Sequence, residues 1–211
     1  MNIRLEAPTD YRAAEELTRE AFWNHFEPGA NEHYLVHTMR GHPDFLPELC
    51  FVAEENGVLV GHIAYNRAKI AGEDGAEYPV LCFGPLSVLP KYQGKGVGSA
   101  LVRHTLELAK AQGHTAVLIM GNPNFYGRLG FRCGERYDIR HASGKFMPAL
   151  LAYELIPGAL DNRAGRFLES PLFEMDMEGF DVFDATFPRR EKREGGKSQE
   201  EFRVLSGLMY G

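Results

Sequence analysis

The sequence predicts a mixed α/β fold in which a mostly antiparallel, twisted sheet is flanked by helices. First, three strand-like stretches follow one another, and the turn signals Asn56-Gly57 and Asp74-Gly75 separate them. Second, a glycine-rich turn and a long helical pattern come directly after the third of these strands. Third, a short apolar strand, a short helix and two weaker strands complete the pattern. We expect the sheet to splay between its fourth and fifth strands.

The first half of the chain carries clear start and stop signals. Ile3 and Leu5 indicate a short first strand, and Thr9 or Asp10 can cap a helix that runs to about residue 22. Asn31 can cap a second helix, which we expect to end before a loop containing prolines 43 and 47. The three antiparallel strands are predicted at residues 50–55, 58–70 and 78–88.

The second half begins with the long helix, predicted at residues 97–112, and a strand at residues 116–120. Asn122 is a good N-cap for a short helix over residues 123–129, because Pro123 suits the first helical position. Residues 137–141 and 149–155 are predicted to be strands. Residues 1–156 form one predicted domain, and residues 157–211 form a C-terminal extension packed on it or trailing from it. In the extension, Ser198 and Glu201 form a capping box for a final helix.

Composition narrows the function classes. The chain has 211 residues, so folding can bury roughly 70% of the surface that the unfolded chain exposes, and the core needs no disulfides. Its three cysteines have no metal-type or disulfide-type spacing, which favours a reducing cytoplasm and no metal. The net charge of -6 does not support a nucleic-acid partner. The N-terminal residues do not resemble a signal peptide, and no window is apolar enough to span a membrane.

The predicted site is the glycine-rich turn that opens the long helix. Gly94, Gly96 and Gly98 fall within five positions. The first turn of a helix has backbone N–H groups without an intrahelical partner, and together with the helix dipole they form an anion site suited to phosphate. The turn therefore predicts a site for the pyrophosphate of a cofactor.

An irregularity lies just upstream in the central strand. Gly84-Pro85 interrupts the strand, because proline cannot donate to a ladder and glycine weakens it. A bulge or splay there would free backbone groups near residues 86–88 for strand-like pairing with an extended ligand. Coenzyme A has the matching shape, with an amide-rich arm joined to a pyrophosphate.

Other glycine motifs fit less well. Position 99 is serine, so the turn is not G-x-G-x-x-G, and the strands before it are antiparallel rather than part of a βαβ unit. The Walker pattern is absent. A dinucleotide-type enzyme remains a third alternative, and it would bind NAD rather than coenzyme A.

Two stretches resemble signatures of the GCN5-related N-acetyltransferases (GNAT). The run Gln93-Gly94-Lys95-Gly96-Val97-Gly98 is similar to that family's Q/R-x-x-G-x-G/A motif. The run from Asn122 to Phe131 resembles its second signature, in which a tyrosine stands five residues before a closing Gly-Phe. The likeness covers about residues 1–155, and it is nearest to bacterial members of unassigned substrate. It implies acetyl transfer from acetyl-CoA to an amine, in a ternary complex.

The resemblance also implies roles for individual residues. Tyr126 would be the general acid, and Asn122 and Phe125 would lie along the pantetheine. Three strand residues would pair with the pantetheine through their backbone: Leu86, Ser87 and Val88. Seven residues would wrap the pyrophosphate: Gln93, Gly94, Lys95, Gly96, Val97, Gly98 and Ser99. A homodimer is compatible with the family, and the acceptor is an amine on a small molecule or a protein.

The general base is left open. The amine must lose a proton, yet residues 78–88 contain no carboxylate or histidine. Glu32, His33, His62 or a water chain are the candidates. His33 and His37 share a helical face, but a structural role is favoured over a metal pair. Because the strand has no base, a non-catalytic acyl-CoA-binding module is the alternative function.

Overall fold

A computed structural model, which describes residues 1–211, places nine strands in one sheet. The strand order is β1-β2-β3-β4-β5-β8-β6, and β9 pairs with both β3 and β7. All pairs along this path are antiparallel except β4 with β5. The strands are β1 (Asn2–Leu5), β2 (Phe45–Glu55), β3 (Val58–Gly72), β4 (Glu77–Val88), β5 (Ala116–Met120), β6 (Arg132–Cys133), β7 (Ile139–Arg140), β8 (Leu150–Glu154) and β9 (Gly165–Leu168).

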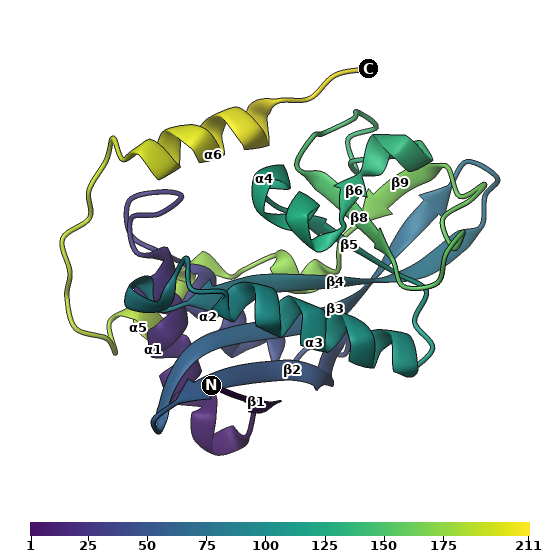
Figure 1. Cartoon of the computed structure of the whole chain (residues 1–211). Coiled ribbons are helices and arrows are strands. Elements are labelled where there is room, and N and C mark those ends of the chain that lie inside the picture. The colour runs from purple at the N-terminus through teal and green to yellow at the C-terminus, as the bar shows by residue number, and fades with distance from the viewer.

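Helices cover both faces of the sheet (Figure 1). On one face, the paired residues Gly61 of β3 and Val88 of β4 face α3, since a Cβ added at Gly61 would meet Val97 and Leu101. On the other face, Ser87 of β4 donates a hydrogen bond to Thr18 of α1. The helices are α1 (Tyr11–Phe22), α2 (Glu32–Met39), α3 (Val97–Ala111), α4 (Pro123–Tyr126), α5 (Met177–Asp184) and α6 (Lys197–Gly207). None of them combines the length and apolar character that crossing a membrane requires.

The sheet splays where it was expected to. β4 and β5 are paired only at Leu81 and Val117, so the part of β4 that follows Leu81 has no partner on that side. The predicted fold class, a mixed α/β fold with a mostly antiparallel sheet that opens between the fourth and fifth strands, is confirmed.

The first part of the C-terminal extension packs against the rest of the fold. β9 pairs with the end of β3, and Leu172 joins a small core with Leu35, Met39 and Ala64 on the α2 face of the sheet. A long segment then leads to α6, which lies apart from the sheet (Figure 1). In the middle of α6, Phe202 stacks on Phe26 with ring centroids 4.6 Å apart.

Some local predictions were wrong. Pro47 lies within β2 rather than in a loop, and the strand tolerates it because regular pairing with β3 lapses between Leu46 and Phe51. The predicted strand at residues 137–141 starts with a 3-10 turn, Gly134–Tyr137, which leaves only β7. Residues 127–129 are also a 3-10 turn rather than α-helix.

Several capping predictions also need correction. Ser198 lies inside α6, which starts from Gly196 without a side-chain cap, so the expected capping box does not form. Asp10 and Asn31 stand at the N-caps of α1 and α2, but neither side chain caps its helix. The Asp10 carboxylate instead accepts hydrogen bonds from Arg4 and from the Ala7 N–H.

Candidate active site

The interruption at Gly84-Pro85 is a β-bulge. Ile63 of β3 faces Leu86, and Tyr65 faces Phe83. Two steps along β3 therefore match three steps along β4, so β4 carries one extra residue between these pairs. The bulge lies between Phe83 and Leu86, shortly after Leu81, the residue of β4 that pairs with β5.

Beyond the bulge, the backbone of β4 directs N–H and carbonyl groups to the open side. The Leu89 N–H donates to the Val60 carbonyl at 3.0 Å, so Leu89 faces β3. In an antiparallel ladder, the backbone N–H and C=O groups of alternate residues point to opposite edges of the strand. The backbone groups of Ser87 therefore point to β3, and those of Leu86 and Val88 point to the splay. The Gln93 side chain confirms this direction for Val88, because its Nε2 donates to the Val88 carbonyl at 3.0 Å.

The glycine turn shapes the start of α3. Gly94 has φ 71° and Gly96 has φ 87°, a backbone region that glycine adopts without steric cost. Gly96 is the N-cap of α3 and has no side chain to cap it. The first helical bond runs from Ala100 N to Gly96 O, at 2.9 Å. The N–H groups of Val97, Gly98 and Ser99 therefore remain available to an anion.

Replacement of Gly96 by alanine tests this turn. An added Cβ would meet no heavy atom within 4 Å, so packing is unaffected, but the positive φ costs roughly 1–2 kcal/mol. We expect Gly96→Ala to weaken acetyl-CoA binding about tenfold or more in calorimetry, because the turn must distort. Gly57→Ala is the matched control, since Gly57 has φ 77°, equally open surroundings and a place in the distant β2–β3 hairpin. An equal loss of acetyl-CoA binding in both variants would mean that the glycine turn does not bind the cofactor.

Gly98 joins three elements at one point. A Cβ there would lie 3.5 Å from Val88, 3.6 Å from Leu86 and 3.6 Å from the Phe125 ring. The N-terminus of α3, the unpaired end of β4 and the side chain of Phe125 are therefore neighbours. The structure thus brings most of the predicted cofactor-binding residues together. Ser87 differs, since its buried hydroxyl donates to Thr18 Oγ1 at 2.9 Å on the opposite face.

Asn122 and Tyr126 bound the other side of the splay. The Asn122 side chain caps α4 by accepting a hydrogen bond from Asn124 N at 2.9 Å, as its position predicted. Tyr126 packs against Phe83 and Phe131, with centroid separations of 5.8 and 5.5 Å. Its ring also fills the space beside Gly121, where a Cβ would lie 2.5 Å from it.

The surroundings of Tyr126 suit a proton donor. Burial, and secondarily the charge of Cys82, raise the pKa of Tyr126 above its ordinary value. The phenol therefore stays protonated at neutral pH, so a proton is present there for the departing thiolate. Its hydroxyl makes no hydrogen bond within the protein, which leaves it available to a ligand.

Two histidines proposed as bases are engaged elsewhere. His33 is fully buried, and its Nε2 lies 3.0 Å from Asp184 in a cluster with Phe180, Phe183 and Phe187. Burial lowers the pKa of His33 to about 4. His37 contacts Glu15 instead, so the two histidines do not form a metal pair. His62 is fully buried as well, with its Nε2 3.3 Å from Glu6 Oε1 and 3.4 Å from Cys50 Sγ.

The cluster of Glu6, Cys50 and His62 has metal-ligand chemistry, and its ligand atoms lie within 4.8 Å of one another. Arg40, however, donates to both oxygens of Glu6, at 2.7 and 3.2 Å, and to Glu15 at 2.7 Å. A guanidinium already neutralises the carboxylate that a metal ion would need. We therefore interpret this cluster as a structural link between the end of β1, β2, β3 and α2.

Two partly buried carboxylates lie on the face of α1 and α2. Burial raises the pKa of Glu32, the first residue of α2, to about 7. Burial alone raises the pKa of Glu169, which directly follows β9, to about 7. Glu32 was a candidate from the sequence, whereas Glu169 was missed because nothing local indicated that β9 would carry it onto the sheet.

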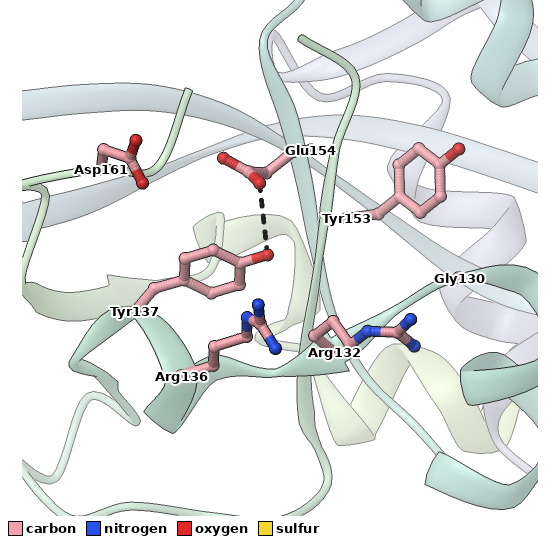
Figure 2. Close-up of a pocket in the computed structure, with 7 residues that line it drawn as sticks. All are labelled: Gly130, Arg132, Arg136, Tyr137, Tyr153, Glu154 and Asp161. Atoms are coloured by element: carbon pink, nitrogen blue, oxygen red, sulfur yellow. Dashed lines mark hydrogen bonds between the residues drawn. The ribbon is translucent and has the colours of Figure 1, made fainter. Parts of the chain in front are cut away.

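A separate polar pocket lies beside β8. It has a volume of about 610 Å³, and Figure 2 shows the Tyr137 hydroxyl directed at Glu154, which it reaches at 3.4 Å. The lining residues are Gly130, Arg132, Arg136, Tyr137, Tyr153, Glu154 and Asp161. None of them is a predicted site residue.

Comparison with known proteins agrees with this geometry. Residues 14–131, more than half of the chain, match the model of the acetyltransferase (GNAT) family. The chain belongs to this family. The matched range includes most of α1, all of α2, the bulged strand β4, the glycine turn and Tyr126. The resemblance first seen in two short motifs is thus confirmed, and the GNAT chain is an acetyltransferase.

Relatives with solved structures extend the match. The uncharacterised N-acetyltransferase YhbS of Escherichia coli is 29% identical over 165 residues, which span 78% of this chain and 93% of YhbS. The crystal structure of YhbS in complex with CoA superposes with a TM-score of 0.73, covering 82% of this chain and 92% of that one. A GNAT acetyltransferase of Brucella melitensis in complex with acetyl-CoA is 28% identical, with a TM-score of 0.65 and coverage of 82% and 97%.

Proposed function

We propose that this GNAT protein transfers the acetyl group of acetyl-CoA directly to a primary amine within a ternary complex. One observation carries the proposal: the parted end of β4 lies against the uncapped start of α3, with Tyr126 across the opening. The complexes of YhbS with CoA and of the Brucella enzyme with acetyl-CoA support the same co-substrate.

In this proposal, the turn from Gln93 to Ser99, which includes Lys95, holds the pyrophosphate through backbone N–H groups. Leu86 and Val88 pair with the amide-rich arm, while Asn122 and Phe125 lie beside it. Tyr126 then donates a proton to the sulfur as the thioester breaks.

The cysteines favour direct transfer over an acetyl-cysteine intermediate. A nucleophilic cysteine needs an accessible thiolate. Burial raises the pKa of both Cys50 and Cys82 well above the ordinary value, so both remain thiols at neutral pH. Elsewhere in the chain, Glu32 and Glu169 each have a pKa of about 7, so a base need not come from β4 itself.

A thiol-release assay tests the proposal. The full chain is mixed with acetyl-CoA and, in separate reactions, benzylamine, spermidine, kanamycin, or a lysine-containing peptide with a free N-terminus. Calorimetry measures acetyl-CoA binding in parallel. We expect binding together with amine-dependent thiol release and a mass gain of one acetyl group on at least one acceptor. Binding without acetylation of any acceptor would instead support the non-catalytic module.

A further inference from the structure

The C-terminal extension places a carboxylate, that of Glu169, beside the last part of β3. β9 pairs antiparallel with β3, and its last residue, Leu168, faces Lys69. Glu169, one residue further, falls level with Ala68. Side chains alternate along a strand, so Glu169 shares the face of Ala68. Cys82 of β4 lies on this face too, because it faces Asn66, two residues from Ala68.

The chain after Glu169 is fixed against the same face. Ser170 donates a hydrogen bond to Asp44 Oδ2 at 2.6 Å, and its oxygen accepts one from Leu172 N at 3.2 Å. Leu172 is 5% exposed and belongs to the small core beside α2. The Phe173 ring lies 3.8 Å from the position of a Cβ on Gly84. The segment that carries Glu169 thus ends in contact with the bulge of β4.

The charge on Cys82 is coupled to that of Glu169 and to that of Tyr126. After burial, the charge of Glu169 is the next cause of the raised pKa of Cys82. The charge of Cys82 is likewise the next cause, after burial, of the raised pKa of Tyr126. Both couplings involve Cys82, two residues before Gly84 of the bulge.

Glu169 has the properties of a base without a structural partner. It is partly buried, and no hydrogen bond or cation contributes to its pKa of about 7. A group with a pKa near the working pH is the most effective proton acceptor. The other titratable groups of the elements packed around it are engaged: Asp44 accepts from Ser170, Arg67 donates to the Pro43 carbonyl, and Lys69 pairs with Glu77.

We propose that Glu169 accepts the proton that the acceptor amine loses as its nitrogen attacks the thioester, an assignment that rests on the proposed function. An N–C bond forms and the C–S bond breaks. The proton of the amine passes to the Glu169 carboxylate, and the phenol proton of Tyr126 passes to the departing sulfur. Exchange with solvent then restores both residues.

Glu32 is the other candidate for the general base. Its pKa is also about 7, but one oxygen accepts a hydrogen bond from Asn31 N at 3.1 Å, and it stands at the start of α2. Glu169 instead belongs to a segment that reaches the bulge itself. His33 and His62 are fully buried and already have acidic partners, so neither can receive a proton from an acceptor amine.

The test compares three single substitutions in the full chain: Glu169→Gln, Glu32→Gln, and Glu174→Gln as an exposed control five residues along the same segment. Rates of acetyl transfer are measured between pH 5.5 and 9 with the amine that wild-type protein acetylates fastest among the four acceptors. We expect Glu169→Gln to lower kcat/KM by about 10²–10⁴-fold, to lose the ionisation near pH 7, and to keep the Kd for acetyl-CoA. The other two variants should retain rate and pH profile.

A second readout does not depend on turnover. Burial raises the pKa of Glu169 above that of the unfolded chain, so its contribution to stability is full below about pH 4.5 and is lost as the pH rises through about 7. Glu169→Gln should therefore melt at a higher temperature than wild type at pH 8 and near the wild-type temperature at pH 5. A Glu169→Ala variant should regain activity when sodium formate is added, since formate can occupy the vacated space as a base.

The outcomes separate the two proposals. If wild-type protein is active and Glu169→Gln is equally active, the assignment of Glu169 is wrong but the proposed function stands. The same conclusion follows if Glu32→Gln, rather than Glu169→Gln, loses the ionisation near pH 7. Wild-type protein that binds acetyl-CoA but acetylates no amine overturns the proposed function and the assignment with it.

Discussion

Replacement of Tyr126 by phenylalanine should leave acetyl-CoA affinity within about twofold of wild type while turnover falls by about 10²–10⁴-fold. The ring keeps its contacts with Phe83, Phe125 and Phe131, so the shape of the opening is retained. Only the hydroxyl is lost, and with it the proton for the departing sulfur. Steady-state rates with a primary amine, beside calorimetric titration with acetyl-CoA, measure the two effects separately.

The matched control is Tyr137→Phe, which removes a hydroxyl from the polar pocket beside β8 (Figure 2). That variant should acetylate at the wild-type rate. Unchanged turnover in Tyr126→Phe would remove the phenol from the reaction. A parallel loss of cofactor affinity would show that the hydroxyl binds the co-substrate rather than donating a proton to it.

Replacement of Arg40 by methionine should destabilise the fold by about 3–5 kcal/mol, the usual effect of leaving a buried ion unpaired. Arg40 is 8% exposed in its side chain and bridges Glu6 and Glu15, which are 2% and 6% exposed. Methionine keeps much of the aliphatic bulk but leaves both carboxylates without this cation. The free energy of unfolding in urea measures the effect. Arg203→Met, which breaks an exposed contact with Glu200 on α6, should change it by less than about 1 kcal/mol.

The same variant should change the acid side of the stability curve. Burial would raise the pKa of Glu6, but hydrogen bonds from His62 and Arg40 outweigh it and lower the pKa to about 2. A lowered pKa contributes stability that is complete above the unfolded value near 4.5 and is lost as the pH falls toward 2. Without Arg40, this loss between about pH 5 and 2 should become smaller. An identical acid dependence in both proteins would mean that Arg40 does not hold Glu6 ionised.

The cofactor side of the site could be predicted from the sequence because local chemistry determines it. Gly94 and Gly96 have positive φ angles, which other residues adopt only at a cost in free energy. A glycine cluster before a helix therefore indicates such a turn by itself. Gly84-Pro85 likewise signals its own irregularity, since a proline cannot complete a ladder. Asn122 and Pro123 mark the start of α4 by capping rules alone.

The acceptor side depends on contacts between distant segments, which no local pattern specifies. β9 has only four residues, and its place beside β3 determines where Glu169 lies. The Phe-rich segment that follows shows its apolar character in the sequence. Its docking at the bulge, however, depends on Ser170 meeting Asp44 and on Phe173 meeting Gly84. The histidines were misleading because burial and acidic partners, rather than availability, explain their positions.

A crystal structure of the protein with acetyl-CoA tests the proposed site most directly. We predict the pyrophosphate within about 2.7–3.2 Å of the N–H groups of residues 97–99. The pantetheine arm should lie between residues 86–88 of β4 and β5, and the thioester sulfur should lie within hydrogen-bond distance of the Tyr126 hydroxyl. Acetyl-CoA bound instead between Arg132 and Arg136 in the pocket beside β8, with the splay empty, would contradict this placement of the active site.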